Sequence, residues 1–347
     1  IINLYNKEKN MDNLKKLGLS ALAGSLVAFS ANAGELSVSG GAKLSYTGAQ
    51  GNEDNSDTGN NFGMQRLVTM SGSGELDNGM SVSLVHTFAT STGDGSTSSV
   101  TIDMGSMGTL GYGQDSYQVG ISKIDDIIPT AEEEVSNGLS LTATESATGA
   151  VNGNTYEVDL GGNGFNYTLS AGDMATIVVG WAPRGVDNLN DDGAAGGTDG
   201  DGSDSSVHVV LTPMDGLTVV AGTGERVNGN EMDDMETFGA TYTYGPVSAG
   251  IQVSEIDYEA ANSGTARDAD TTYMGLAFNV NENLSISYGE QETDLAGVSV
   301  DQELEGMSIA YSMRGVSIKA HNNEGTGMGG VANNASEHTE ISVSFAF

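Results

Sequence analysis

The sequence predicts an all-β protein in which about sixteen antiparallel strands close into a barrel that spans a membrane. Three observations predict this fold. Apolar and polar residues alternate with a period of two across residues 34–347, short and long connections alternate between the segments, and no run of about 20 apolar residues occurs there. Only strands can then carry the chain across a bilayer. The mean hydropathy of −0.20 agrees, because one face of each strand in such a barrel is polar.

The N-terminal region has the pattern of an export signal. Two lysines precede a mostly apolar stretch over residues 17–30, and the small-residue motif Ala31-Asn32-Ala33 follows. This order is typical of a cleaved secretory signal, and the stretch is too short for a membrane-spanning helix. We therefore expect a signal peptide over residues 11–33, an upstream extension or added residues over 1–10, and one barrel domain over 34–347.

Strand alternation is clear at both ends of the expected barrel. Apolar or small residues fall at every second position in residues 35–47 and again in residues 338–347. The same period recurs in residues 80–88, 100–104, 165–169, 177–179, 238–244, 247–253, 273–280, 284–288, 307–313 and 316–320. Glycine, at 50 of 347 residues, suits strands that must curve and turn in a barrel.

The connections between the strands differ strongly in length. Short turns are expected at residues 77–79, 105–108, 161–164, 213–216, 245–246, 281–283 and 314–315. Long polar connections are expected at residues 48–61, 115–137, 185–204, 228–235, 260–270, 292–301 and 322–337. Bacterial outer-membrane barrels have tight turns on one side and long loops on the other, and an even number of strands. The count therefore favours sixteen, with one segment between residues 155 and 183 misassigned.

Composition excludes several functions. Lys and Arg number 12 against 47 Asp and Glu, for a net charge of −35, so a surface that neutralises nucleic-acid phosphates is not expected. The absence of cysteine removes disulfides and thiolate chemistry. The four histidines lack the spacing of metal or catalytic motifs, so we expect no enzymatic activity.

Several segments resemble the general porins of Gram-negative bacteria, particularly the alphaproteobacterial type. They are GELSVSGGAKLSYTG, QRLVTMSGSGELDNGMSVSLVHTF, MGSMGTLGYGQDS and the last ten residues, which end on Phe347. The resemblance covers residues 34–347 and implies passive diffusion of small hydrophilic solutes and ions across the outer membrane, without a cofactor. It also implies a homotrimer, contact with outer-membrane lipid and lipopolysaccharide, and a role for Phe347 as the signal to the barrel-assembly machinery.

In this family the third extracellular loop folds into the barrel and narrows the pore. The matching region is residues 115–137, so the resemblance implies an inward-folded constriction loop there. Its acids would repel anions and concentrate cations at a narrow point. A solvated surface loop is the alternative. The candidate acids are Asp125, Asp126, Glu132, Glu133 and Glu134.

Porins of this family set basic side chains on the wall that faces the acidic loop. Lys43 and Lys319 lie on the polar faces of their expected strands, and Arg66 lies on the second strand. If the first strand pairs with the last, these three residues share one wall. Because so few cations oppose so many acids, we expect a pore that prefers cations.

One acidic, glycine-rich connection suggests a metal site. Its carboxylates are Asp191, Asp192, Asp199, Asp201 and Asp204, which offer the oxygen ligands that Ca²⁺ favours. Their spacing does not fit the EF-hand loop, and a hydrated acidic rim that shares divalent ions with lipid headgroups is the other interpretation. The alternative function is therefore a secreted acidic Ca²⁺-binding protein of a surface layer, or an adhesin.

Overall fold

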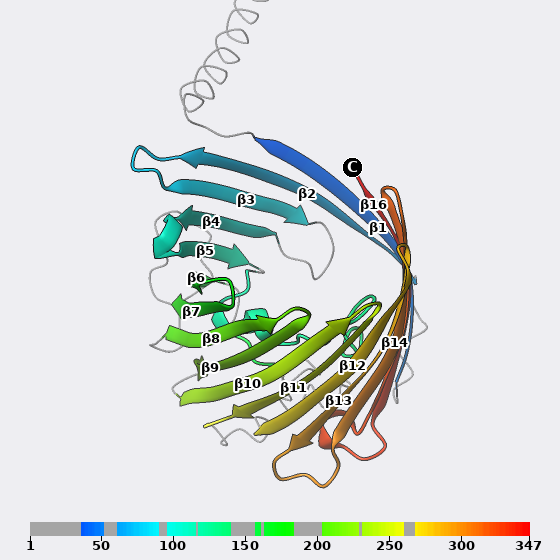
Figure 1. The fold of residues 1–347 in the computed structure, drawn as a ribbon. Helices are drawn as coiled ribbons and strands as arrows, with labels where there is room; N and C mark the ends of the chain where they lie inside the picture. The colour runs from blue at the N-terminus through cyan, green and yellow to red at the C-terminus, as the bar shows by residue number, and fades with distance from the viewer. Residues whose placement is uncertain are drawn as a thin grey trace, which may run out of the picture.

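The structure is a computed structural model that describes residues 36–51, 61–89, 96–115, 117–139, 157–160, 163–183, 203–228, 231–259 and 268–347. Sixteen antiparallel strands form one closed barrel in these residues (Figure 1). Each strand pairs with its neighbours in sequence, and β1 pairs with β16 to close the ring. The predicted fold class is therefore confirmed. None of the described residues forms a helix long and apolar enough to cross a membrane.

The strands have the following bounds. They are β1 Ser37–Gly51, β2 Phe62–Glu75, β3 Ser81–Ala89, β4 Thr97–Asp103, β5 Thr109–Asp115, β6 Gly164–Ala171, β7 Ala175–Pro183, β8 Ser203–Met214, β9 Leu217–Asn228, β10 Glu231–Tyr244, β11 Val247–Asp257, β12 Ala269–Asn281, β13 Leu284–Leu295, β14 Gln302–Met313, β15 Val316–Thr326 and β16 Ala335–Ala346. Short 3₁₀ helices are η1 Gly105–Met107, η2 Gly120–Ile124 and η3 Met328–Gly330.

Tight turns join the strands in pairs at one end of the barrel. Gly216 connects β8 to β9 with a φ of +75°, and a Cβ there would lie 2.2 Å from the carbonyl oxygen of Thr243, so only glycine fits. The predicted turn at residues 161–164 is wrong. Gly164 begins β6, and the turn lies at residues 172–174, because the connection after β5 continues to residue 163.

The two faces of the barrel have opposite character. On β11, Ile251 and Val253 are exposed on the outer face, whereas Gln252 and Ser254 alternate with them and are buried. Gln252 contacts the segment that lies inside the barrel, which establishes the direction of each face. A membrane barrel has this arrangement, with apolar side chains toward lipid and polar side chains toward the lumen.

The segment after β5 lies inside the ring of strands (Figure 1). We call residues 117–139 the constriction loop. Its apolar residues Val119, Ile121 and Ile124 pack with residues 157–160 and with the inner wall in a buried cluster. A second cluster joins Leu139 to the wall near η3. The main apolar cores of the described residues therefore lie between this loop and the wall, and they hold the loop in the lumen.

Candidate pore constriction

A buried glutamine of the wall holds the middle of the constriction loop. Gln252 on β11 is 1% exposed, and its Oε1 accepts a hydrogen bond from the backbone N–H of Ile127 at 2.9 Å. Its Nε2 lies within 2.9 Å of the carbonyl oxygens of Ile124 and Asp125 and of the hydroxyl of Thr237. An amide supplies one acceptor and two donors, so this side chain satisfies backbone groups that would otherwise be buried without partners.

Two further wall amides hold the ends of the constriction loop. Near its start, Asn166 on β6 accepts a hydrogen bond from the N–H of Gly120 at 2.7 Å and donates to the carbonyl of Gln118 at 2.9 Å. Near its end, Asn323 on β15 donates to the carbonyl of Asn137 at 2.9 Å. Both amides are 2% exposed. The loop is thus tied to the wall at three separated points.

A row of glycines in the wall gives the loop a close seat. Gly275 and Gly289 face each other on β12 and β13, and the row continues directly across the neighbouring strands. A Cβ at Gly275 would lie 2.3 Å from Cγ2 of Ile128, and one at Gly289 would lie 2.9 Å from Cγ1 of Val135. The loop therefore packs directly against the backbone of the wall, and a larger residue at these glycine positions would displace the loop. This glycine row consists of Gly250, Gly275, Gly289 and Gly306.

Two of the predicted acids, Asp125 and Asp126, lie in the middle of the constriction loop. Both are half-buried, and Oδ1 of Asp126 accepts a hydrogen bond from the N–H of Ile128 at 2.6 Å. Removal from water raises the pKa of each carboxyl to about 6. At neutral pH these two acids are mostly ionised, and they carry negative charge into the lumen.

A third predicted acid, Glu134, is grouped with Asp125 and Asp126 and with Glu157, which the sequence analysis did not single out. Loss of water, and then the charges of Asp126 and Asp125, raise the pKa of Glu134 to about 7. Burial, followed by the charges of Glu134 and the two aspartates, raises the pKa of Glu157 to about 9. Glu157 lies in the connection after the predicted loop, and no local pattern marked it. We call these four carboxyls the loop acid cluster.

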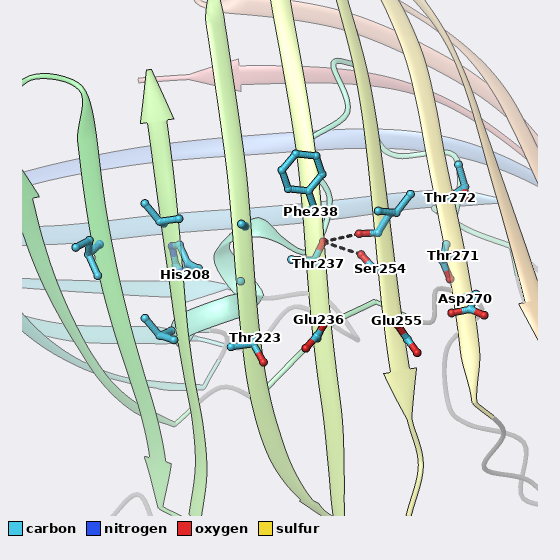
Figure 2. A pocket seen from close by; sticks show the side chains of 16 residues that line it. His208, Thr223, Glu236, Thr237, Phe238, Ser254, Glu255, Asp270, Thr271 and Thr272 are labelled. Carbon is cyan, nitrogen blue, oxygen red and sulfur yellow. Dashed lines mark hydrogen bonds between the residues drawn. The ribbon is translucent and has the colours of Figure 1, made fainter. Parts of the chain in front are cut away.

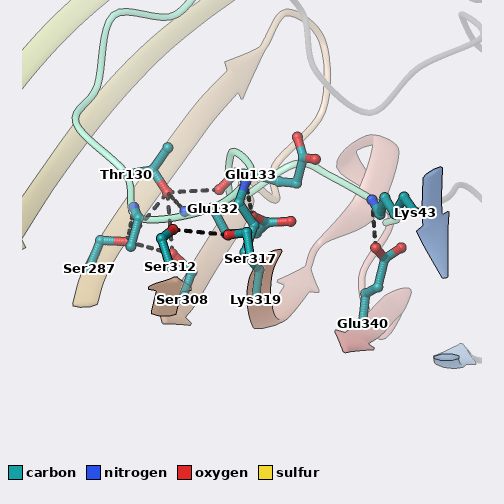
Figure 3. A network of polar contacts seen from close by, with 11 residues as sticks. Lys43, Thr130, Glu132, Glu133, Ser287, Ser308, Ser312, Ser317, Lys319 and Glu340 are labelled. Atoms are coloured by element: carbon teal, nitrogen blue, oxygen red, sulfur yellow. Dashed lines mark hydrogen bonds and ion pairs between the residues drawn. The ribbon is translucent and has the colours of Figure 1, made fainter. Parts of the chain in front are cut away.

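Glu132 contacts the wall and not the open lumen. Its Oε2 lies 2.5 Å from Nζ of Lys319 on β15, and its side chain is 2% exposed (Figure 3). The neighbouring Thr130 lies within 3.3 Å of the hydroxyls of Ser287 and Ser308, which anchors this part of the loop to β13 and β14. Loop and wall charges are therefore in direct contact and not separated across the pore.

Lys43 also has a carboxylate partner. Its Nζ lies 2.6 Å from Oε1 of Glu340 on β16, the strand that pairs with β1 (Figure 3). Glu133 is half-buried and lies close enough to act electrostatically on Lys43. Glu340 was missed in the sequence analysis, although its position opposite the apolar face of the last strand placed it toward the lumen. Lys43 and Lys319 do lie on one wall, with β16 between them.

Arg66 does not belong to this wall. It pairs with Ala42 of β1, whereas Gln65 pairs with Lys43, so Arg66 lies on the opposite face of the sheet from Lys43. It is exposed and alternates with the exposed apolar residues Met64 and Val68 of the outer face. The prediction that it lines the lumen is wrong. Successive residues of a strand point to opposite faces, and the register places Gln65, and not Arg66, on the same face as Lys43.

The predicted calcium ligands lie mostly outside the described residues, which include Asp204 but not Asp191, Asp192, Asp199 or Asp201. Asp204 is buried on β8, and its Oδ1 accepts a hydrogen bond from the N–H of Val227 at 2.8 Å. Within the described ranges, no three His, Cys, Asp or Glu side chains are arranged to hold a metal ion. A calcium site stays a prediction.

Two histidines of the inner wall form a pair that the sequence did not reveal. Nε2 of His321 on β15 lies 3.0 Å from Nδ1 of His338 on β16, and both side chains are buried. Gly138, near the end of the constriction loop, packs against the ring of His338. The pair therefore forms part of the seat of the loop.

Comparisons with known proteins agree with this architecture. A family model of Gram-negative porins matches residues 18–340. Among solved structures, an anion-selective porin from Comamonas acidovorans is 12% identical, with a TM-score of 0.62 and coverage of 90% of this chain and 99% of that chain. The trimer form of OmpT, an outer membrane protein of Vibrio cholerae, is also 12% identical, with a TM-score of 0.61 and coverage of 91% and 100%.

A further porin structure is 15% identical, with a TM-score of 0.59 and coverage of 90% of this chain and 100% of that one. A search among curated proteins found no match. Identities this low establish a likeness of fold alone. The family match is different, because it extends over most of the chain and agrees with the closed barrel and its inner loop. This chain is therefore an outer-membrane protein that belongs to the Gram-negative porin family.

Proposed function

We propose that this porin is a passive diffusion channel for small hydrophilic solutes and ions, and that it prefers cations. The imbalance of charge at the constriction loop supports this preference. Lys43 and Lys319 each have a carboxylate partner within 2.6 Å, so neither is an isolated positive charge. The carboxylates of Asp125 and Asp126, by contrast, accept hydrogen bonds from backbone N–H groups of the loop and are mostly ionised at neutral pH.

The mechanism requires no chemical step. Solutes partition into the water-filled lumen, and the fixed carboxylates raise the local concentration of cations and lower that of anions. The effect is larger in a narrow lumen with low-dielectric walls than in open water. Selectivity is set by such side chains and not by the fold, which is consistent with an anion-selective porin having the same architecture.

Reversal potentials in planar bilayers test the preference. With a tenfold KCl gradient, the protein should give a potential of the sign that indicates cation permeation. The double variant Asp125→Asn, Asp126→Asn should shift that potential toward zero, because two lumen charges are removed. Asp77→Asn, in the exposed turn between β2 and β3, is the matched control and should leave it unchanged. A potential of the opposite sign for the wild-type protein would contradict the proposal.

The proposal extends to export and assembly. Residues 11–33 would act as a cleaved signal peptide; they lie outside the described residues, as do residues 1–10. The backbone of Phe347 exchanges hydrogen bonds with Gly40 at 2.8 and 3.0 Å, so the chain end lies at the seam where the barrel-assembly machinery would act. A homotrimer surrounded by outer-membrane lipid and lipopolysaccharide is proposed, with the trimer form of OmpT as support.

The apolar outer face does not favour the alternative of a secreted Ca²⁺-binding surface-layer or adhesin protein. Side chains such as Phe238 and Ile251 are about half exposed on that face, at 55% and 51%. A secreted protein would present this surface to water, whereas a bilayer covers it.

A further inference from the structure

The outer face of the barrel carries a groove over strands β7 to β12. Its volume is about 800 Å³, and Figure 2 shows the side chains that line it, among them Glu236, Phe238 and Glu255. The apolar part of its lining comes from outward positions on five of these strands, β7 to β11. These residues are Ile177, Val207, Val209, Ala221, Phe238 and Val253. A hydrocarbon chain is the natural occupant of such a surface in a bilayer.

One end of the groove is strongly acidic. Glu236, Glu255 and Asp270 lie directly opposite one another on β10, β11 and β12. All three are exposed and line the groove (Figure 2). On the next level, Asp234 lies opposite Asp257. Directly opposed like charges on neighbouring strands are destabilising, with Cβ atoms about 5 Å apart, so this end of the groove favours a cationic partner.

The position of the acidic end corresponds to the level of lipid headgroups. On β10 the outward residues change from Glu236 to the apolar Phe238, and on β11 from Glu255 to Val253. The carboxylates therefore lie at the edge of the apolar band that faces the hydrocarbon interior. Among the described residues that line the groove, none is Lys or Arg.

We propose that this groove binds one lipid whose head group carries a primary ammonium. One hydrocarbon chain lies against Val207, Phe238 and Val253, and the ammonium donates hydrogen bonds to the carboxylates of Glu236, Glu255 and Asp270. An ammonium offers three donors, which matches three acceptors on adjacent strands. A phosphate bridged by a divalent ion fits less well. Such an ion needs several oxygens at about 2.0–2.6 Å, and no three of the described acids are grouped closely enough to hold a metal. An ammonium is bound at the longer hydrogen-bond distances of about 2.7–2.9 Å.

Native mass spectrometry of the full chain, folded in neutral detergent, tests this site. The probe is a dioleoyl lipid with a primary ammonium head group and no phosphate, compared with dioleoyl phosphatidylglycerol in the presence and absence of Mg²⁺. We expect one ammonium lipid to bind more tightly than the others. The triple variant Glu236→Gln, Glu255→Gln, Asp270→Asn should weaken it at least tenfold. Tighter binding of phosphatidylglycerol with Mg²⁺ would overturn the proposal.

A matched control removes the same charge elsewhere on the outer face. Glu290→Gln, Glu292→Gln, Glu303→Gln neutralises three exposed acids of β13 and β14 that do not line the groove. This variant should keep the tight site. Equal weakening by both triple variants would show a general acidic surface and contradict a defined site.

Two single variants keep the test decisive if the triple variant does not fold. Thr223→Lys places a cation opposite Glu236 and should compete with the head group. Ala221→Phe fills the groove and leaves its charges, so it should weaken binding as well. Heat-modifiable migration on a gel and unchanged single-channel conductance show that each variant is folded. Undiminished binding by either folded variant would contradict the proposed pose.

Discussion

At the scale of single residues, buried amides determine where the constriction loop lies. Gln252 is separated from Ile127 by 125 positions in sequence, yet its amide accepts a hydrogen bond from a backbone N–H of the loop and donates one to a backbone carbonyl oxygen of the loop. A buried backbone group that loses its partner costs about 1–3 kcal/mol. Substitution of one wall side chain can therefore change the shape of the constriction, although that side chain does not belong to the constriction loop.

The variant Gln252→Leu should loosen the loop while the barrel stays closed. It leaves the N–H of Ile127 and the carbonyl of Ile124 without their amide partner, at a cost of roughly 1–3 kcal/mol for each buried group. We expect faster amide hydrogen exchange in residues 119–129 and a changed, noisier single-channel conductance. Gln114→Leu is the control, because Gln114 bonds Tyr112 on the outer face of β5. Unchanged exchange in Gln252→Leu would show that the other anchors suffice.

At the scale of elements, the glycine row explains part of the high glycine content. The sequence analysis attributed glycine to strand curvature and turns, and positions such as Gly216 agree with that interpretation. The four directly opposed glycines on β11 to β14 have another role, because Ile128 and Val135 of the loop occupy the space where side chains would lie. Flat stretches of wall let the loop pack closely without filling the lumen.

The substitution Gly275→Ala should displace the loop from its seat. The new Cβ would lie 2.3 Å from Cγ2 of Ile128, and such overpacking typically costs about 1–3 kcal/mol. We expect a lower midpoint in urea unfolding and an altered conductance. Gly48→Ala on β1, where a Cβ meets no atom within 4 Å, should change neither quantity. An effect of equal size at Gly48 would attribute the loss to backbone conformation instead.

At the scale of the whole molecule, the structure assigns part of the net negative charge to particular places. The acids of the described barrel include the loop acid cluster in the lumen and the carboxylates of the groove on the outer face. Raised pKa values of about 6 for Asp125 and Asp126 and about 7 for Glu134 bring the lumen charge into the range of ordinary pH changes. The pore therefore carries less negative charge in mild acid than its composition implies.

Cation selectivity should increase as pH rises from about 5 to 8. The folded-state pKa values of Asp125, Asp126 and Glu134 lie above the ordinary values of about 4, so loop docking favours the neutral form of these carboxyls. Their stabilising contribution to loop docking is therefore fully present below about pH 4. That contribution is lost as pH rises through 6 to 7, while lumen charge grows. Reversal potentials measured across this range test the effect. In Asp125→Asn, Asp126→Asn most of the pH dependence should disappear; a variant with the wild-type slope would assign it to other groups.

Features that depend on interactions between residues close in the chain could be predicted from the sequence, whereas features that depend on distant residues could not. Turn residues such as Gly216 and the alternation on β11 depend on neighbours in the chain, so they were predictable. The turn at residues 161–164 and the inward direction of Arg66 were wrong. The first depended on how far the connection after β5 continues. The second depended on the strand register, which the sequence did not settle because alternation is blurred around residues 67–70.

The sequence by itself determined a barrel of antiparallel strands with an acidic loop, because period-two patterning and turn chemistry are local. Only the tertiary structure decided which charges meet. The ion pair of Lys319 with Glu132 and that of Lys43 with Glu340 join residues far apart in the chain, and both require the closed ring and the docked loop. The physical reason is that burial and contact set the charge of a carboxyl, and both arise only when distant strands share one lumen.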